Sequence, residues 1–79
     1  MTGLQFAVLR AYAATLPKGS PEREKLARVL WADLPGEALR KTGRAAAQGF
    51  GLLTEGGKLT EEGAQAARAF LSKTAGGQV

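Results

Sequence analysis

The chain has 79 residues with neither cysteine nor histidine, and its 11 Lys and Arg against 7 Asp and Glu give a formal net charge of +4. This length allows one domain with a modest core, and the lack of cysteine excludes disulfides, thiolate metal sites and a cysteine nucleophile. Since histidine is also absent and no two carboxylates have a spacing that spans a cleft, we expect neither an enzyme nor a metal or cofactor site.

The N-terminal residues lack the basic start and continuous apolar stretch of a secretory signal, and no segment has the roughly 20 apolar residues of a membrane span. We therefore expect a soluble, cytoplasmic protein. The basic excess favours a polyanionic partner.

The first helix is predicted over residues 4–16, where apolar residues recur at helical spacing and Arg10 is the one charged residue. Apolar side chains surround this helix, so it is either the centre of the fold or carries a second contact surface. A second contact surface would use Phe6, Leu9 or Ala13, and through it we expect a homodimer.

The second helix is predicted over residues 21–33, because Ser20 is a capping residue and Pro21 suits the first helical position. Its apolar stripe includes Leu26 and Leu30. Trp31 lies off the axis of that stripe, so it is either an edge of the core or an exposed anchor for a partner.

The third helix is predicted over residues 37–49, and the short break before it gives helix-turn-helix spacing. At 100° per residue its two faces differ in character. The small and apolar face, predicted to be buried, holds Leu39, Thr42, Gly43, Ala46 and Phe50. The polar and mostly basic face holds Glu37, Arg40, Lys41, Arg44 and Gln48.

The segment after Phe50 predicts two very short strands around the turn Glu55-Gly56-Gly57, which would form a minimal wing. Thr60 then caps a fourth helix over residues 61–73. We expect a single domain of residues 1–73, followed by a disordered tail at residues 74–79.

Residues 38–71 resemble the second half of a winged helix-turn-helix DNA-binding domain. In that family a recognition helix leads into a Gly-Leu-Leu strand, a wing, and a Leu-Thr-x-x-Gly phrase that opens the closing helix. The matching segments are Gly51-Leu52-Leu53, Glu55-Gly56-Gly57 and Leu59-Thr60-Glu61-Glu62-Gly63. The resemblance implies a mainly α fold of four helices with a minimal two-stranded wing, and binding of double-stranded DNA.

The basic face of the third helix is the candidate DNA-binding site. Arginine can fork onto guanine, lysine can bind phosphate or guanine, and glutamine can pair with adenine. The candidate residues are Arg40, Lys41, Arg44, Gln48 and, at the wing, Lys58. The alternative interpretation is an ordinary solvated face.

The leading hypothesis is a DNA-binding module that acts as a small transcriptional or mobile-element regulator in a bacterium or its phage. The rival hypothesis is a protein-interaction module, such as a phage-encoded inhibitor or adaptor that docks on a host protein. In either case the predicted core contains Leu26, Leu30, Leu39, Phe50, Leu53 and Phe70.

Overall fold

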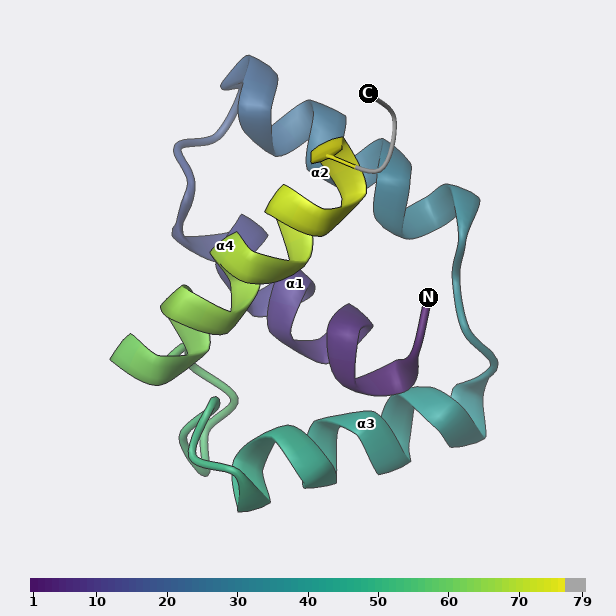
Figure 1. Cartoon of the computed structure of the whole chain (residues 1–79), viewed down its shortest axis with the longest axis vertical. Helices are drawn as coiled ribbons and strands as arrows, with labels where there is room; N and C mark the ends of the chain where they lie inside the picture. The colour runs from purple at the N-terminus through teal and green to yellow at the C-terminus, as the bar shows by residue number, and fades with distance from the viewer. Residues whose placement is uncertain (77–79) are drawn as a thin grey trace.

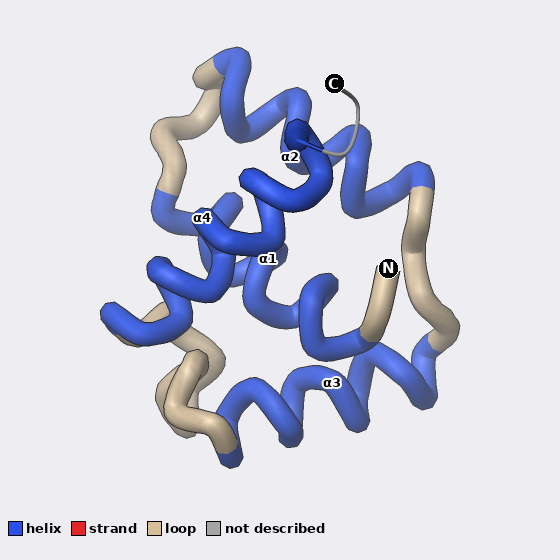
Figure 2. Tube along the Cα trace, viewed as in Figure 1, coloured by secondary structure: helices blue, strands red, loops and turns tan. Residues whose placement is uncertain are grey.

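A computed structural model describes residues 1–76, and the side chains of residues 1–73. It contains four α-helices, shown in Figures 1 and 2: α1 (Gly3–Thr15), α2 (Pro21–Ala32), α3 (Glu37–Gly49) and α4 (Glu61–Gly76). All four predicted helices are confirmed. Helix α4 continues past its predicted end at Lys73, and the last part of the predicted tail, residues 77–79, lies outside the described residues.

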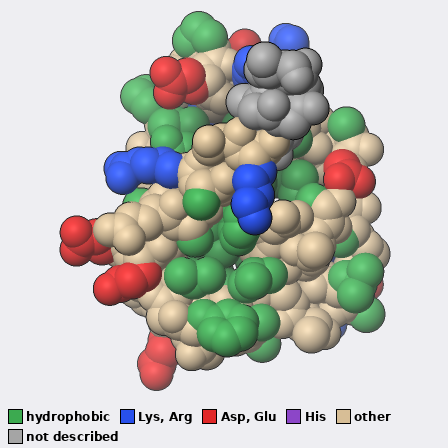
Figure 3. Space-filling view, in the orientation of Figure 1, with side chains coloured by type: hydrophobic (Ala, Val, Ile, Leu, Met, Phe, Trp, Pro, Cys, Tyr) green, Lys and Arg blue, Asp and Glu red, His purple; other side chains and the backbone are tan. Residues whose placement is uncertain are grey.

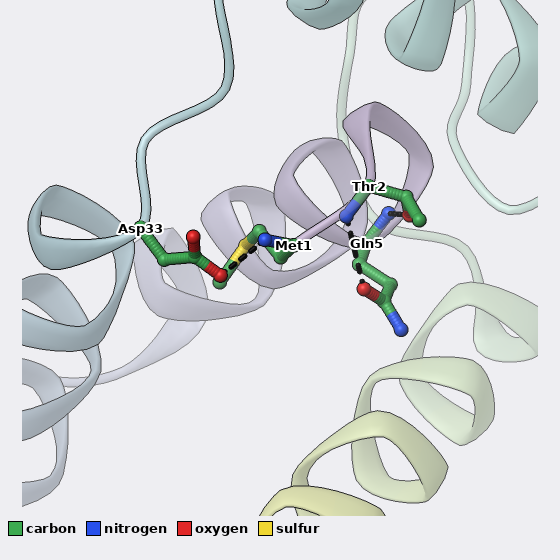
Figure 4. A network of polar contacts seen from close by, with 4 residues as sticks. All are labelled: Met1, Thr2, Gln5 and Asp33. Carbon is green, nitrogen blue, oxygen red and sulfur yellow. Dashed lines mark hydrogen bonds and ion pairs between the residues drawn. The ribbon is translucent and has the colours of Figure 1, made fainter.

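The start of α1 is fixed by a reciprocal cap, shown in Figure 4. The Thr2 hydroxyl accepts from the Gln5 backbone N–H at 3.1 Å, and the Gln5 side-chain oxygen accepts from the Thr2 N–H at 3.1 Å. Beside this cap the amino group of Met1 forms an ion pair with the carboxylate of Asp33. The N-terminus is thereby tied to the end of α2.

The starts of α2 and α4 are capped as their sequences predict. Ser20 accepts from the Arg23 backbone N–H at 3.2 Å, with Pro21 at the first helical position. Thr60 accepts from the Gly63 N–H at 3.0 Å. A side chain on Gly63 would overlap the Leu52 carbonyl, so the first turn of α4 rests on the preceding loop.

Helix α1 is the centre of the fold. Figure 1 shows it between α2 and α3, with α4 crossing it, and each of these three helices packs against it. This confirms the central position, one of the two interpretations of the first helix. The buried apolar residues are Phe6, Ala7, Val8, Leu9, Leu26, Leu30, Ala47, Leu53 and Ala67.

The most extensive helix contact, between α1 and α3, depends on two glycines. A Cβ on Gly43 would overlap the backbone of Gly3, and a Cβ on Gly3 would overlap the carbonyl of Leu39. One helical turn further along α3, Ala47 is fully buried. The two backbones therefore meet directly, and only small side chains fit between them.

The predicted buried face of α3 is wrong in part: Gly43 is buried and Ala46 is half-buried as predicted, but Thr42 is exposed. Leu39 is 59% exposed and Phe50 is 70% exposed, whereas Gly43 and Ala47 are buried. The inward direction is rotated by roughly 60° from the predicted one, at 100° per residue. Of the other predicted core residues, Leu26, Leu30 and Leu53 are buried, and Phe70 is partly buried.

The exposure of Phe50 follows from how α3 ends. Gly51 has a positive φ of 77°, its N–H donates to the Gln48 carbonyl, and the Leu52 N–H donates to the Ala47 carbonyl at 2.8 Å. This pair of bonds is the Schellman arrangement, which stops a helix at the residue before the glycine. Phe50 therefore lies at the cap, beyond the last buried turn of α3.

The predicted two-stranded wing is also wrong. The described residues contain no strand or sheet, and the loop of residues 52–60 has only an isolated bridge between Leu53 and Leu59. Within it, the Thr54 N–H donates to the Lys58 carbonyl at 2.8 Å, while the Thr54 hydroxyl accepts from the Lys58 N–H at 3.1 Å. These bonds close the loop next to the bridge, so the backbone pairing does not extend into two strands.

Two phenylalanines form a matched pair for testing this core. Phe6→Ala should cost about 3 to 5 kcal/mol, because Phe6 is only 7% exposed. Phe50→Ala should change stability by less than about 1 kcal/mol, because its ring is largely in solvent already. Thermal melts of both variants measure the difference, and a Phe50→Ala protein that melts as early as Phe6→Ala would show that α3 has been placed with the wrong face inward.

Candidate nucleic-acid interface

Three arginines from two helices converge on one pocket. Arg10 comes from α1, and Arg40 and Arg44 come from successive turns of α3. The pocket has a volume of about 260 Å³ and lies between α1, α3 and the loop at Gly56 and Gly57. Its remaining lining is small or apolar, so charge enters it only from the guanidinium groups.

A second pocket adjoins the first. It has a volume of about 360 Å³, extends from α1 towards α2, and is lined in part by Arg23 and Trp31. Arg10 and Arg40 line both pockets. We call the two pockets together the arginine groove; its charged residues are Arg10, Arg23, Arg40 and Arg44. No Asp or Glu is among the described residues that line it.

The groove has a surplus of positive charge. Among the described side chains, those of residues 1–73, the ion pairs are Met1 with Asp33 and Lys41 with Glu37, so Arg10, Arg40 and Arg44 have no carboxylate partner there. Guanidinium groups that line one pocket without a counter-charge repel one another. An anion bound among them would relieve that repulsion and gain charge-assisted hydrogen bonds.

The loop after α3 places Arg44. The Gln48 side-chain amide donates to the carbonyls of Thr54 at 3.2 Å and Glu55 at 3.3 Å, which fixes the loop against α3. A Cβ on Gly57 would lie 2.7 Å from Nη2 of Arg44, so the guanidinium lies directly over the glycine backbone. The bare backbone at Gly57 thus leaves room for Arg44 at the end of the groove.

The predicted DNA-binding residues separate into two groups. Arg40 and Arg44 are brought together in the groove. Lys41 is exposed, lines neither pocket and pairs with Glu37 at 3.8 Å. The side chain of Gln48 is engaged by the loop, and Lys58 is exposed outside the groove.

The predicted partner contacts also separate. Phe6 and Leu9 lie in the core, and Ala13 is half-buried. These three residues leave little surface for a partner. The homodimer therefore stays a prediction, and the surface predicted for it is mostly buried. Trp31 is 75% exposed, so of its two interpretations the edge of the core is wrong and the exposed side chain holds.

Sequence reasoning missed Arg10 and Arg23. Arg10 is the one charged residue of α1, and this lone charge is the signal that could have pointed to it. Arg23 faces the groove from the first turn of α2, where its Nη1 also donates to the Leu16 carbonyl at 3.1 Å. Nothing in the local spacing relates either residue to α3.

The rest of the described surface offers less defined chemistry. On the face that carries α4, Figure 3 shows hydrophobic side chains gathered between α4 and α3, with scattered Lys and Arg. A separate, largely apolar groove of about 570 Å³ lies between α1, α2 and α4. Residues 1–76 hold no group of three or more carboxylates suited to a metal ion, and no helix among them is long and apolar enough to cross a membrane.

Comparison with known proteins gave no matching family model, and no curated protein or solved structure matched the chain significantly.

Proposed function

We propose that this chain is a DNA-binding module, of the kind that serves small transcriptional or mobile-element regulators, and that it binds DNA through the arginine groove. The observation that carries the proposal is the convergence of Arg10, Arg40 and Arg44, without a carboxylate partner, on one concave site. The resemblance of residues 38–71 to a winged helix-turn-helix domain supports it. The wing has no part in it.

The groove suits a phosphate backbone. Arginine offers a planar fork of donors to phosphate oxygens and stays charged at any physiological pH. Each phosphate neutralised releases condensed counterions, which supplies much of the affinity of DNA-binding proteins. The three unpaired arginines of the groove allow one chain to neutralise about three phosphates.

In this proposal the protein binds DNA mainly through the phosphate backbone and less through the bases. Gln48, predicted from the sequence to pair with adenine, is hydrogen-bonded to its own loop, and Lys41, predicted to bind phosphate or guanine, lines neither pocket. Phosphate contacts position a protein on DNA without reading its sequence. We therefore expect affinity that depends more on charge than on sequence.

Two adjacent residues of α3 provide the test. Arg40→Ala removes one of the two cations that line both pockets, whereas Lys41→Ala removes the same charge one position away, at an exposed residue that lines neither pocket. We expect Arg40→Ala to weaken DNA binding about 5- to 30-fold, equivalent to roughly 1 to 2 kcal/mol, and Lys41→Ala to weaken it less than about 3-fold. The fluorescence anisotropy of a labelled 16-nucleotide DNA, as a duplex and as one of its single strands, measures the affinity of both variants.

Equal losses in the two variants would mean that overall charge, and not the groove, binds DNA. No binding of either DNA form at low salt would reject the proposal outright.

A second candidate function is docking on another protein. The specific observation in its favour is the apolar groove between α1, α2 and α4, which Leu9, Tyr12, Leu16, Phe70 and Leu71 help to line. An inhibitor or adaptor would use such a groove for an apolar segment of its target. If the chain bound no DNA, protein docking would become the leading candidate function.

A further inference from the structure

We infer that the arginine groove takes a single-stranded oligonucleotide, with one base stacked on the exposed ring of Trp31. This inference rests on the proposed function, because it assigns the form of nucleic acid that the same groove binds.

The first step is the course of the groove. Its two pockets share Arg10 and Arg40 in their linings, so they lie next to each other along α1. One end lies at Arg44 and Gly57, and the other lies at Trp31 on α2. Positive charge is therefore distributed along a path, as the backbone of an extended strand requires.

The second step is the shape of the site. Arg10, Arg40 and Arg44 line a concave pocket between α1 and α3, in which Arg40 is half-buried and the other two are exposed. A recognition helix that enters the major groove of a duplex needs its contact residues on a protruding face instead. A single strand is narrow enough to follow a groove between two helices.

The third step is the aromatic platform. Trp31 is 75% exposed although it is the largest apolar side chain in the sequence, and it lines the second pocket with Arg10, Arg23 and Arg40. An indole that lines a pocket together with three arginines matches the pairing of charged groove and stacking ring found in proteins that bind single strands. The flanking arginines favour a nucleic acid over a protein as the occupant of this ring.

Trp31 is the only tryptophan in the chain, so its fluorescence reports on the site directly. We expect both 16-residue oligothymidylate and 16-residue oligouridylate to quench it on binding, and the DNA and RNA arms to show which sugar is preferred. A DNA duplex of the same length should bind, as judged by anisotropy, with much less quenching.

Substitution separates stacking from charge. Trp31→Ala should weaken single-strand binding about 5- to 150-fold and change duplex binding less than about 2-fold, because stacking requires an unpaired base. Trp31→Phe should restore most of the affinity, since a phenyl ring also stacks. Both variants should melt within about 3 °C of the parent, because the ring is largely exposed.

The outcomes are distinguishable. Binding of DNA without quenching, equal quenching by the duplex, or unchanged single-strand affinity in Trp31→Ala would overturn the inference and leave the proposed function standing. If neither the duplex nor the single strands bound at low salt, both would fail.

Discussion

Replacing Gly43 by alanine is expected to destabilise the protein by about 3 kcal/mol or more, although alanine favours helix more than glycine does. The added Cβ would overlap the backbone of Gly3, and a backbone cannot move aside as a flexible side chain can. Overpacking usually costs about 1 to 3 kcal/mol, and this site is at the upper end because α1 and α3 would have to separate.

The size of the effect matters because the domain is small. At 79 residues, the total stability is on the order of 4 to 12 kcal/mol. A loss of about 3 kcal/mol should lower the melting temperature by roughly 12 to 24 °C. Thermal melts followed by circular dichroism measure it.

Gly49→Ala is the matched control. Gly49 ends the same helix, and a Cβ there meets no atom within 4 Å. The same chemical change should therefore stabilise the protein by about 0.4 to 1 kcal/mol, through helix propensity and a less flexible unfolded chain. If Gly43→Ala melted at or above the parent temperature, the direct crossing of α1 and α3 would be refuted.

The helices could be predicted from the sequence because their signals are local. The Ser20-Pro21 start and the Thr60 cap act within a single turn, and the structure has both caps in place. The position of α1 could be decided only from the structure, because a helix with apolar side chains all round can lie at the centre of a fold or carry a contact surface.

The buried face of α3 could not be predicted from residue size. Sequence reasoning assigns large apolar side chains to the core, which selects Leu39 and Phe50. The direct approach of Gly3 to Gly43 excludes large side chains from the α1–α3 contact, so small residues are buried and the large ones are left outside. Close backbone contact is a property of two segments and has no signal in either one alone.

The same limit applies to the site. Arg40 and Arg44 could be found from one face of α3. Arg10 and Arg23 join them only because α1 packs against α3 and α2 packs against α1. The wing failed for a different reason. The Gln48 side chain donates to the carbonyls of Thr54 and Glu55, and the Thr54 hydroxyl accepts from the Lys58 N–H, so backbone groups that a longer strand pair would use are already bonded.

The measurement that tests the central claim most directly is the salt dependence of DNA affinity in two triple variants of equal charge. One replaces the unpaired arginines of the groove by alanine, at Arg10, Arg40 and Arg44. The other replaces exposed cations that line neither pocket, at Lys18, Arg28 and Arg68. Both lower the net charge by the same amount, so their difference reports on position alone.

For the parent we expect a log-log slope of affinity against salt of about −2 on a single strand and about −3 on a duplex, from three phosphates neutralised. The groove variant should bring the slope close to zero and lose most of the affinity at low salt. The control variant should keep the slope of the parent. Equal slopes in the two variants, or a groove variant that binds DNA as tightly as the parent, would contradict the assignment of the arginine groove as the DNA-binding site.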